Sequence, residues 1–181
     1  MSAENVAVIK GLYDAFGTGD ISGVLGRMSP NIVWHEAENF SYSDNNPYCG
    51  PEAVAEGVFA RCIGEWDGFA VAMKDLIDGG DRVVALGRYV GSFKDTGREM
   101  NPQAVHVWTL KDGKAVAFQQ YIDTLDVARA TGAARPTDSF PPIADLPLST
   151  LCGHSITQLW SVSGASSDLQ SRPRPLMGYR L

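Results

Sequence analysis

The residues best suited to chemistry lie in one predicted hairpin between Gln103 and Thr124. Two strand-like runs are joined there by Asp112-Gly113, a pair that favours a two-residue turn because it tolerates positive φ. With that turn, paired residue numbers have a constant sum, so His106 is predicted to lie opposite Gln119. Histidine changes its charge near neutral pH, which makes this hairpin a candidate for acid/base chemistry.

Side-chain alternation predicts which residues share the face of His106. Successive side chains on a strand point to opposite faces, so Tyr121, Asp123 and Trp108 are expected on the His106 face, together with Gln119. The other face is expected to be apolar and carries Val105, Val107, Val116, Phe118 and Ile122. The sequence therefore predicts either a possible acid/base set or the ordinary wetted face of an antiparallel sheet.

Length, charge and cysteine usage narrow the class of protein. The chain has 181 residues, 44% hydrophobic and 20% charged, which fits one domain with a sizeable core. Its formal net charge of -6 leaves no broad basic surface for nucleic acid. The start lacks a signal-peptide pattern, and no apolar run approaches the roughly 20 residues of a membrane span. We expect a cytoplasmic protein that binds neither membranes nor nucleic acid.

The cysteines do not form a metal or disulfide pattern. Cys49, Cys62 and Cys152 are odd in number and widely separated, and no Cys-x-x-Cys pair occurs. This usage favours buried, reduced thiols over a disulfide framework or a zinc site. We therefore expect no structural metal.

The N-terminal part is predicted to form helices. Apolar residues recur at three- and four-residue spacing up to Gly17, and a second, shorter helix follows a possible cap at Asp20 and ends before Pro30. Gly50-Pro51 then opens a third helix, because proline suits the first helical position, and this helix ends near Gly64 or Trp66.

Strands are predicted over 31–36, 69–77 and 82–93 and in the hairpin, separated by turn-forming segments. Helices collected before most of the strands indicate helices packed on one face of a sheet. The predicted class is α+β, with a strongly curved antiparallel sheet.

This order of elements resembles the nuclear transport factor 2-like superfamily over residues 1–132. The resemblance is closest to the SnoaL-like, ketosteroid-isomerase-related branch, and its motifs are Val33-Trp34, Tyr48-x-Gly50, Asp78-Gly79-Gly80-Asp81, Asp112-Gly113-Lys114 and Gln120-Tyr121-x-Asp123-Thr124. It implies a cone-shaped cavity between a curved, partly mixed sheet and the helices, and a homodimer formed through the sheet's outer face. The superfamily hosts isomerases, cyclases, hydratases, epoxide hydrolases and binding proteins, so function must be argued from the cavity residues.

The ketosteroid isomerase pattern fits in part. The resemblance places the general base at Glu36, which can remove an activated proton if an apolar setting raises its pKa. It places the oxyanion-stabilising tyrosine at Met28, which has no O–H to donate, and its partner aspartate at His106. A steroid-type oxyanion hole is therefore not expected.

The polyketide cyclase pattern places the acid/base residue at Asp123 and a histidine at His106. Here Asp123 would be the base, His106 the polarising donor, and Gln119 or Tyr121 orienting groups, with no cofactor required. The substrate would be a small hydrophobic carbonyl compound. An epoxide hydrolase would instead use Arg88 with Glu36 and Asp123, and a non-catalytic small-molecule binder or dimeric interaction domain is the alternative to all three.

Aromatic residues are candidates for the substrate pocket. Trp34, Tyr48 and Phe59 can form an apolar wall for a flat molecule, although such residues are equally suited to a core. His35 and Glu36 are neighbours on a strand, so only one of them can face the pocket. By the resemblance we expect Glu36 inside with Trp34.

The composition changes at residue 133. Prolines and serines are frequent over 133–181, and neither Lys nor Glu occurs after Arg135. We predict that this segment is an appended extension, partly docked and partly disordered.

Overall fold

The first third of the chain forms three helical segments, as its apolar periodicity predicts. A computed structural model describes residues 2–133. Helix α1 spans Ser2–Gly17 and α2 spans Ile21–Leu25, capped by the Asp20 carboxylate, which accepts from the backbone N–H of Gly23 at 2.8 Å. The third helix starts at Pro51 and continues through α3 (Pro51–Val54), the π-helical turn η1 (Ala55–Phe59) and α4 (Ala60–Glu65).

The strands form one mixed sheet. Its order is β2-β1-β7-β6-β4-β3, with β5 paired to β4, and among the strands of residues 2–133 only the β1–β7 pair is parallel. The strands are β1 (Met28–His35), β2 (Tyr48–Cys49), β3 (Trp66–Asp78), β4 (Arg82–Phe93), β5 (Glu99–Met100), β6 (Gln103–Lys111) and β7 (Lys114–Ile122). A last helix, α5, spans Thr124–Thr131. The expected α+β class is confirmed, and Met28, predicted to lie in the second helix, instead begins β1 beside β7.

The β6–β7 hairpin has the predicted turn but not the predicted register. Asp112 and Gly113 both have positive φ, 51° and 73°, and Lys111 pairs with Lys114. Between Thr109 and Leu110 the register shifts by one residue, so His106 pairs with Gln120 and not with Gln119. The extra residue in β7 is a β-bulge, and it exchanges the two faces of the strand beyond it.

Because of the bulge, the predicted faces of Phe118, Gln119, Tyr121 and Ile122 are wrong. Phe118 and Gln120 turn to the inner face, where both are buried, while Gln119 is half-buried and Tyr121 is 57% exposed. Asp123 lies beyond the end of β7 and is exposed. On β6 the predicted alternation holds: His106 and Trp108 are buried.

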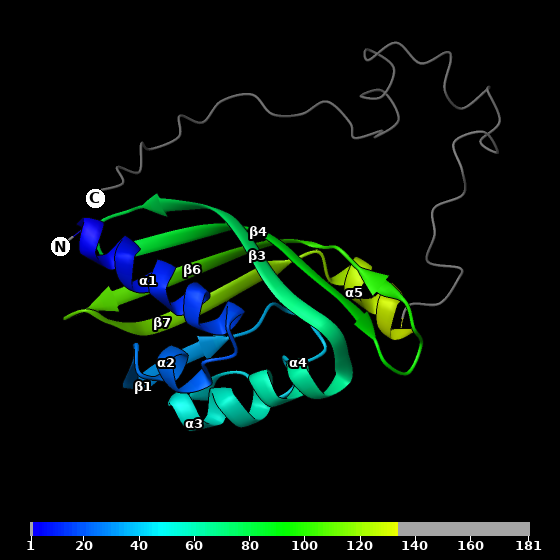
Figure 1. The fold of residues 1–181 in the computed structure, drawn as a ribbon. Helices are drawn as coiled ribbons and strands as arrows, with labels where there is room; N and C mark the ends of the chain where they lie inside the picture. Colours follow the sequence, from blue (N-terminus) through cyan, green and yellow to red (C-terminus); the bar gives the residue numbers. More distant parts are fainter. Residues whose placement is uncertain (1, 134–181) are drawn as a thin grey trace, which may run out of the picture. The chain divides into compact units, whose positions relative to one another are not determined.

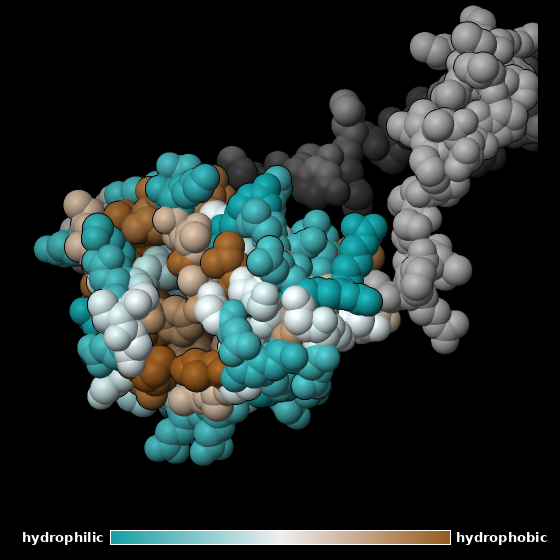
Figure 2. Space-filling model, turned by 45° about the vertical axis from the view of Figure 1, so that its right-hand side comes forward, coloured by the Kyte–Doolittle hydropathy of each residue, from teal (hydrophilic) through white to brown (hydrophobic). Residues whose placement is uncertain are grey.

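The helices cover one face of the curved sheet (Figure 1). Helix α1 packs on β3 and β4, the α3–α4 segment packs on β1 and β3, and α5 contacts β4 and β5. The core lies between this layer and the sheet and includes Ile9, Leu12, Val54 and Trp108. Figure 2 shows one face on which apolar side chains gather around a hollow with hydrophilic residues at its rim.

The predicted extension lies, from residue 134 onward, outside the described residues. Among the helices of residues 2–133, none has the length and apolar character needed to cross a membrane.

Candidate active site

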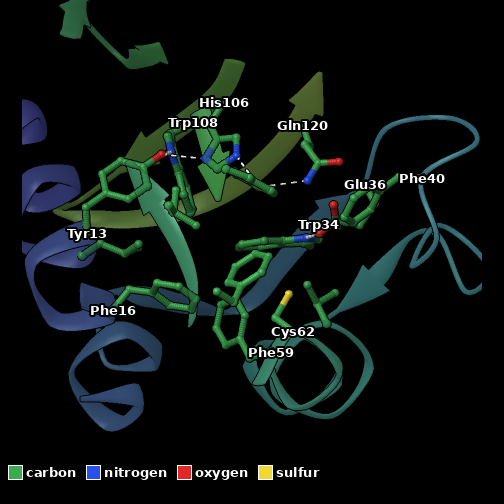
Figure 3. Close-up of a pocket in the computed structure, with 15 residues that line it drawn as sticks. Tyr13, Phe16, Trp34, Glu36, Phe40, Phe59, Cys62, His106, Trp108 and Gln120 are labelled. Atoms are coloured by element: carbon green, nitrogen blue, oxygen red, sulfur yellow. Dashed lines mark hydrogen bonds between the residues drawn. The ribbon is translucent and has the colours of Figure 1, made fainter. Parts of the chain in front are cut away.

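A cavity of about 40 Å³ lies between α1, α4 and the inner face of the sheet. This volume has room for a few water molecules. The wall is aromatic and aliphatic, with few polar groups, and Figure 3 shows Tyr13, His106, Gln120 and Glu36 directed toward the same space. The lining residues used below are Tyr13, Phe16, Trp34, Glu36, Phe40, Phe59, Cys62, Tyr89, His106, Trp108 and Gln120.

A chain of hydrogen bonds crosses the top of the cavity, and we call it the His106 array. Trp108 Nε1 donates to Tyr13 Oη at 2.8 Å, and Tyr13 Oη lies 2.7 Å from His106 Nδ1. On the other side of the ring, His106 Nε2 lies 2.6 Å from Tyr89 Oη, which accepts from Gln120 Nε2 at 2.9 Å. Both nitrogens of one imidazole are therefore held by tyrosine hydroxyls.

The bulge and the loop after β1 position the Gln120 end of this array. The backbone N–H of Ala37 donates to Gln120 Oε1 at 3.1 Å, which fixes the amide with its NH₂ group toward Tyr89. Since a backbone N–H can only donate, the orientation of the amide is unambiguous.

Burial keeps His106 neutral. The side chain is 4% exposed, its hydrogen-bond partners are hydroxyls, and burial lowers the pKa of the imidazole from 6.5 to about 3. Burial likewise raises the pKa of Tyr13 and of Tyr89 above the usual range, so both phenols keep their protons. The array is thus uncharged at neutral pH.

Glu36 has a different environment. Its side chain is 2% exposed and Trp34 Nε1 donates to Oε1 at 2.7 Å, whereas Oε2 is buried without a hydrogen-bond partner. Burial raises the pKa of this carboxyl from 4.5 to about 7, against the opposing effect of the Trp34 hydrogen bond. A carboxyl with this pKa and a free oxygen can accept a proton at neutral pH.

The loop that follows β1 holds Glu36 in place. Asn46 Oδ1 accepts from the Glu36 backbone N–H at 2.9 Å, and Asn46 Nδ2 donates to the Glu36 carbonyl at 2.8 Å. Trp34 is itself fixed by stacking on Phe118, with ring centroids 3.7 Å apart. Hydrogen bonds to Asn46 therefore fix the backbone of Glu36, and ring stacking fixes the side chain of its donor, Trp34.

The outer part of this loop is attached to α4. Arg61 donates to both carboxylate oxygens of Asp44, at 2.9 and 3.0 Å, and its guanidinium lies 4.2 Å from the Tyr42 ring centroid. Tyr42 Oη donates to Glu65 at 2.9 Å and accepts from Trp66 Nε1 at 2.8 Å. These contacts lie outside the cavity and hold the loop that carries Phe40 into its wall.

Five of the residues predicted from sequence lie together in the cavity. They are Glu36, His106, Trp34, Phe59 and Trp108. Glu36 is buried while His35 is only half-buried, which agrees with the choice of Glu36 that the family resemblance implied.

Five other predicted residues do not line the cavity. Asp123 accepts from the backbone N–H groups of Leu125 and Asp126, so its carboxylate caps α5. Tyr48 is buried behind the wall, where its hydroxyl donates to the carbonyl of Tyr42 at 2.6 Å. Arg88 donates to the carbonyl of Asn101, and Gln119 donates to the carbonyl of Gln120. Tyr121 is exposed. Arg88, Glu36 and Asp123 are therefore not brought together.

Sequence reasoning missed Tyr13, Tyr89 and Gln120. Tyr13 lies in the apolar stripe of α1 and brings into the cavity a hydroxyl group, which Met28 lacks. Tyr89 lies on the inner face of β4, and Gln120 reaches that face only because of the bulge. Within residues 2–133, no group of three or more His, Cys, Asp or Glu side chains is placed to hold a metal ion.

The sequence and the fold are similar to those of known proteins. The model of the SnoaL-like domain family matches residues 9–118. A nuclear transport factor 2-like protein from Burkholderia thailandensis is 32% identical, covers 70% of this chain and 96% of its own, and superposes with a TM-score of 0.68. TerC, crystallised with polyporic acid, is 28% identical over 71% of this chain and 98% of its own, with a TM-score of 0.64.

More distant structures share the fold alone. A SnoaL-like polyketide cyclase from Jannaschia is 22% identical over 74% of this chain and 95% of its own, with a TM-score of 0.63. Among curated proteins, none matches the chain. The family model spans more than half of the sequence, and the chain belongs to the SnoaL-like family of the nuclear transport factor 2-like superfamily.

Proposed function

We propose that the protein is a proton-transfer enzyme that removes a proton next to a carbonyl group of a small hydrophobic substrate. The observation that carries this proposal is the buried Glu36 carboxyl, whose Oε2 has no partner and whose pKa is raised to about 7. A general base works best when its pKa lies near the working pH. A structural carboxyl in an apolar core would instead be expected to have both oxygens bonded.

The rest of the cavity supplies what such a reaction needs. Removing a proton beside a carbonyl places negative charge on the carbonyl oxygen, and a fixed O–H donor stabilises that charge. Tyr13 and Tyr89 are phenols held neutral in the wall, and Trp34 keeps the Glu36 carboxyl oriented by donating to Oε1. Glu36 is therefore the proposed base and a tyrosine of the His106 array the proposed oxyanion donor.

The cavity also limits the substrate. Its wall includes Phe16, Trp34, Phe59 and Trp108, which suit a flat apolar molecule. Because the cavity volume of about 40 Å³ is smaller than a ring-sized substrate, such a substrate binds only when wall side chains move outward. TerC, a 28% identical neighbour, was crystallised with polyporic acid, which supports a small organic molecule as the ligand class of this protein.

The proposal is tested by hydrogen exchange of small cyclic ketones and enones in D₂O, followed by proton NMR. The intact protein should accelerate exchange beside the carbonyl of at least one compound, and Glu36→Gln should slow it by roughly 10² to 10⁴-fold, the usual contribution of a general base. Glu38→Gln is the matched control, since Glu38 is two residues away and exposed. Equal rates in the intact protein and in Glu36→Gln would remove Glu36 as the base.

Assembly and location remain predictions. Val105 and Val107 lie half-buried on the sheet's outer face, which supports the expected homodimer through that face. A cytoplasmic location also remains an expectation from the sequence.

A further inference from the structure

One hydroxyl proton of the His106 array has no acceptor within the array. Neutral imidazole has one N–H donor and one bare nitrogen acceptor. Tyr13 Oη already accepts from Trp108, and Tyr89 Oη already accepts from Gln120. One tyrosine must therefore donate to the bare nitrogen of His106, while the other accepts from the imidazole N–H and keeps its own proton free.

Two arrangements satisfy every contact. In the first, Tyr13 donates to Nδ1, the Nε2–H donates to Tyr89, and the free O–H belongs to Tyr89. In the second, Tyr89 donates to Nε2, the Nδ1–H donates to Tyr13, and the free O–H belongs to Tyr13. Going from the first to the second, Tyr13 gives its proton to Nδ1 and takes one from a cavity water molecule, while the Nε2 proton passes to Tyr89, which gives its former proton to cavity water. The array therefore keeps its number of protons.

The two ends of the array are not equivalent, because Tyr89 lies at the Glu36 end. Gln120 joins Tyr89 to the backbone N–H of Ala37, the residue after Glu36. Figure 3 shows Gln120 and Glu36 on one side of His106 and Tyr13 on the other. The negative charge of Glu36 also raises the pKa of Tyr89, after the larger effect of burial, whereas the causes that act on Tyr13 are burial and the Trp108 hydrogen bond.

We propose that His106 is a tautomeric bridge that places the free hydroxyl proton on Tyr89 while Glu36 is ionised, and on Tyr13 when the charge has moved to a ligand oxygen. The proposal rests on the proposed function, because proton transfer to Glu36 neutralises that carboxylate and creates an enolate. The enolate oxygen then binds to Tyr13, at the end of the array away from Glu36. Tyr89 and Gln120 act through His106 as positioning residues, and the ligand class is an enolate or phenolate with one charged oxygen.

The tautomer of His106 can be read by long-range ¹H–¹⁵N NMR of histidine-labelled protein. His35→Gln and His154→Gln leave His106 as the single imidazole. At a pH above the Glu36 pKa, the ligand-free protein should show a protonated Nε2 and a bare Nδ1. A protonated Nδ1 in the ligand-free state, or an imidazolium with both nitrogens protonated, overturns the proposal without any ligand being needed.

The bound state is tested with 4-nitrophenolate in the Glu36→Gln protein, in which glutamine stands for the protonated carboxyl. Binding is followed by the absorption of the probe, and the His106 signal should change to protonated Nδ1 and bare Nε2. Binding with Nε2 still protonated overturns the tautomer proposal and leaves the proposed base untouched. Absence of binding contradicts the oxyanion site and hence the proposed function, while the ligand-free spectrum still decides the tautomer.

Two variants test whether Tyr89 is coupled to the bound probe through His106. Tyr89→Phe removes the donor to Nε2 and should raise the Kd for 4-nitrophenolate by about tenfold, although Tyr89 need not touch the probe. Tyr121→Phe is the matched control, because this tyrosine is 57% exposed on the other face. An unchanged Kd in Tyr89→Phe would contradict the coupling through His106.

Discussion

Two polar systems share this cavity and differ in how well they are satisfied. Every polar nitrogen and oxygen of the His106 array has a partner, from Trp108 through Tyr13 and Tyr89 to Gln120, and only one hydroxyl proton stays free for a ligand. Glu36 has one bonded oxygen and one buried oxygen without a partner. A satisfied buried network stabilises and specifies a fold, whereas an unsatisfied buried carboxyl costs stability and stays available for a reaction. The comparison assigns structure, positioning and the proposed oxyanion donor to the array, and proton transfer to Glu36.

Removing the centre of the array should have the largest effect. His106→Leu leaves Tyr13 and Tyr89 without their shared partner in a buried site, and we expect a loss of about 4 kcal/mol in the free energy of unfolding. Urea denaturation measures it. The control is His35→Leu, on the other side of β1, which should change stability by no more than about 0.5 kcal/mol. Wild-type stability in His106→Leu would mean that the array is not a stabilising unit.

Replacing Glu36 should increase the free energy of unfolding, in contrast to replacing His106, and the increase should appear only as the pH rises toward 7. The folded-state pKa of about 7 exceeds the usual 4.5, so the folded protein binds this proton more tightly than the unfolded chain. The contribution to stability is complete below pH 4.5 and is lost as the pH rises through about 7, a change of about 3 kcal/mol. The Glu36→Gln protein should therefore gain about this much relative to wild type between these limits.

Urea denaturation of both proteins across this pH range checks the sign and the size of the change. His106 contributes equally to both proteins, because its own lowered pKa removes stability only as the pH falls below 6.5. The difference between the two proteins thus isolates Glu36. A difference that does not vary with pH would show that Glu36 is solvated.

The same pKa sets the pH dependence of the proposed reaction. Only the ionised carboxylate accepts a proton, so kcat/KM for hydrogen exchange should rise about tenfold per pH unit well below pH 7 and level off above it. Initial rates over a pH series measure this profile. A rise centred near 4.5 would indicate an ordinary exposed carboxylate as the base.

The contacts outside the cavity should matter least. Arg61 and Asp44 are partly exposed, at 29% and 55% of their side-chain surfaces, and solvent screens their ion pair. Asp44→Asn should lower the free energy of unfolding by less than about 1 kcal/mol, measured by urea denaturation. A loss comparable to that of His106→Leu would extend the stabilising network from the cavity to the loop.

The sequence predicted one of the two polar systems better than the other. Strand parity predicted that only one of His35 and Glu36 faces the pocket, and the family resemblance selected Glu36, on the side of Trp34. The turn at Asp112-Gly113 was also predictable from the positive φ that this pair allows. The helices and most strands followed from apolar periodicity and from the glycines and prolines between them, whereas the mixed sheet was implied only by the family resemblance.

The His106 array was only partly predictable. The bulge between the turn and Gln120 has no glycine or proline to mark it, and one extra residue reverses which of Gln119 and Gln120 faces inward. The same shift removed Tyr121 and Asp123 from the predicted set. Tyr13 and Tyr89 come from distant elements, α1 and β4, so their meeting at one imidazole is a property of tertiary packing.

The most direct test is the titration of the Glu36 side-chain carboxyl by ¹³C NMR, with Glu36→Gln used to assign the signal. It needs no substrate and reports the environment of the proposed base. We predict a midpoint near pH 7, because the carboxyl is buried in an apolar wall with one oxygen unpartnered. A midpoint near the usual 4.5 would contradict the account, since the carboxyl would then be solvated and unsuited to serve as the base at neutral pH.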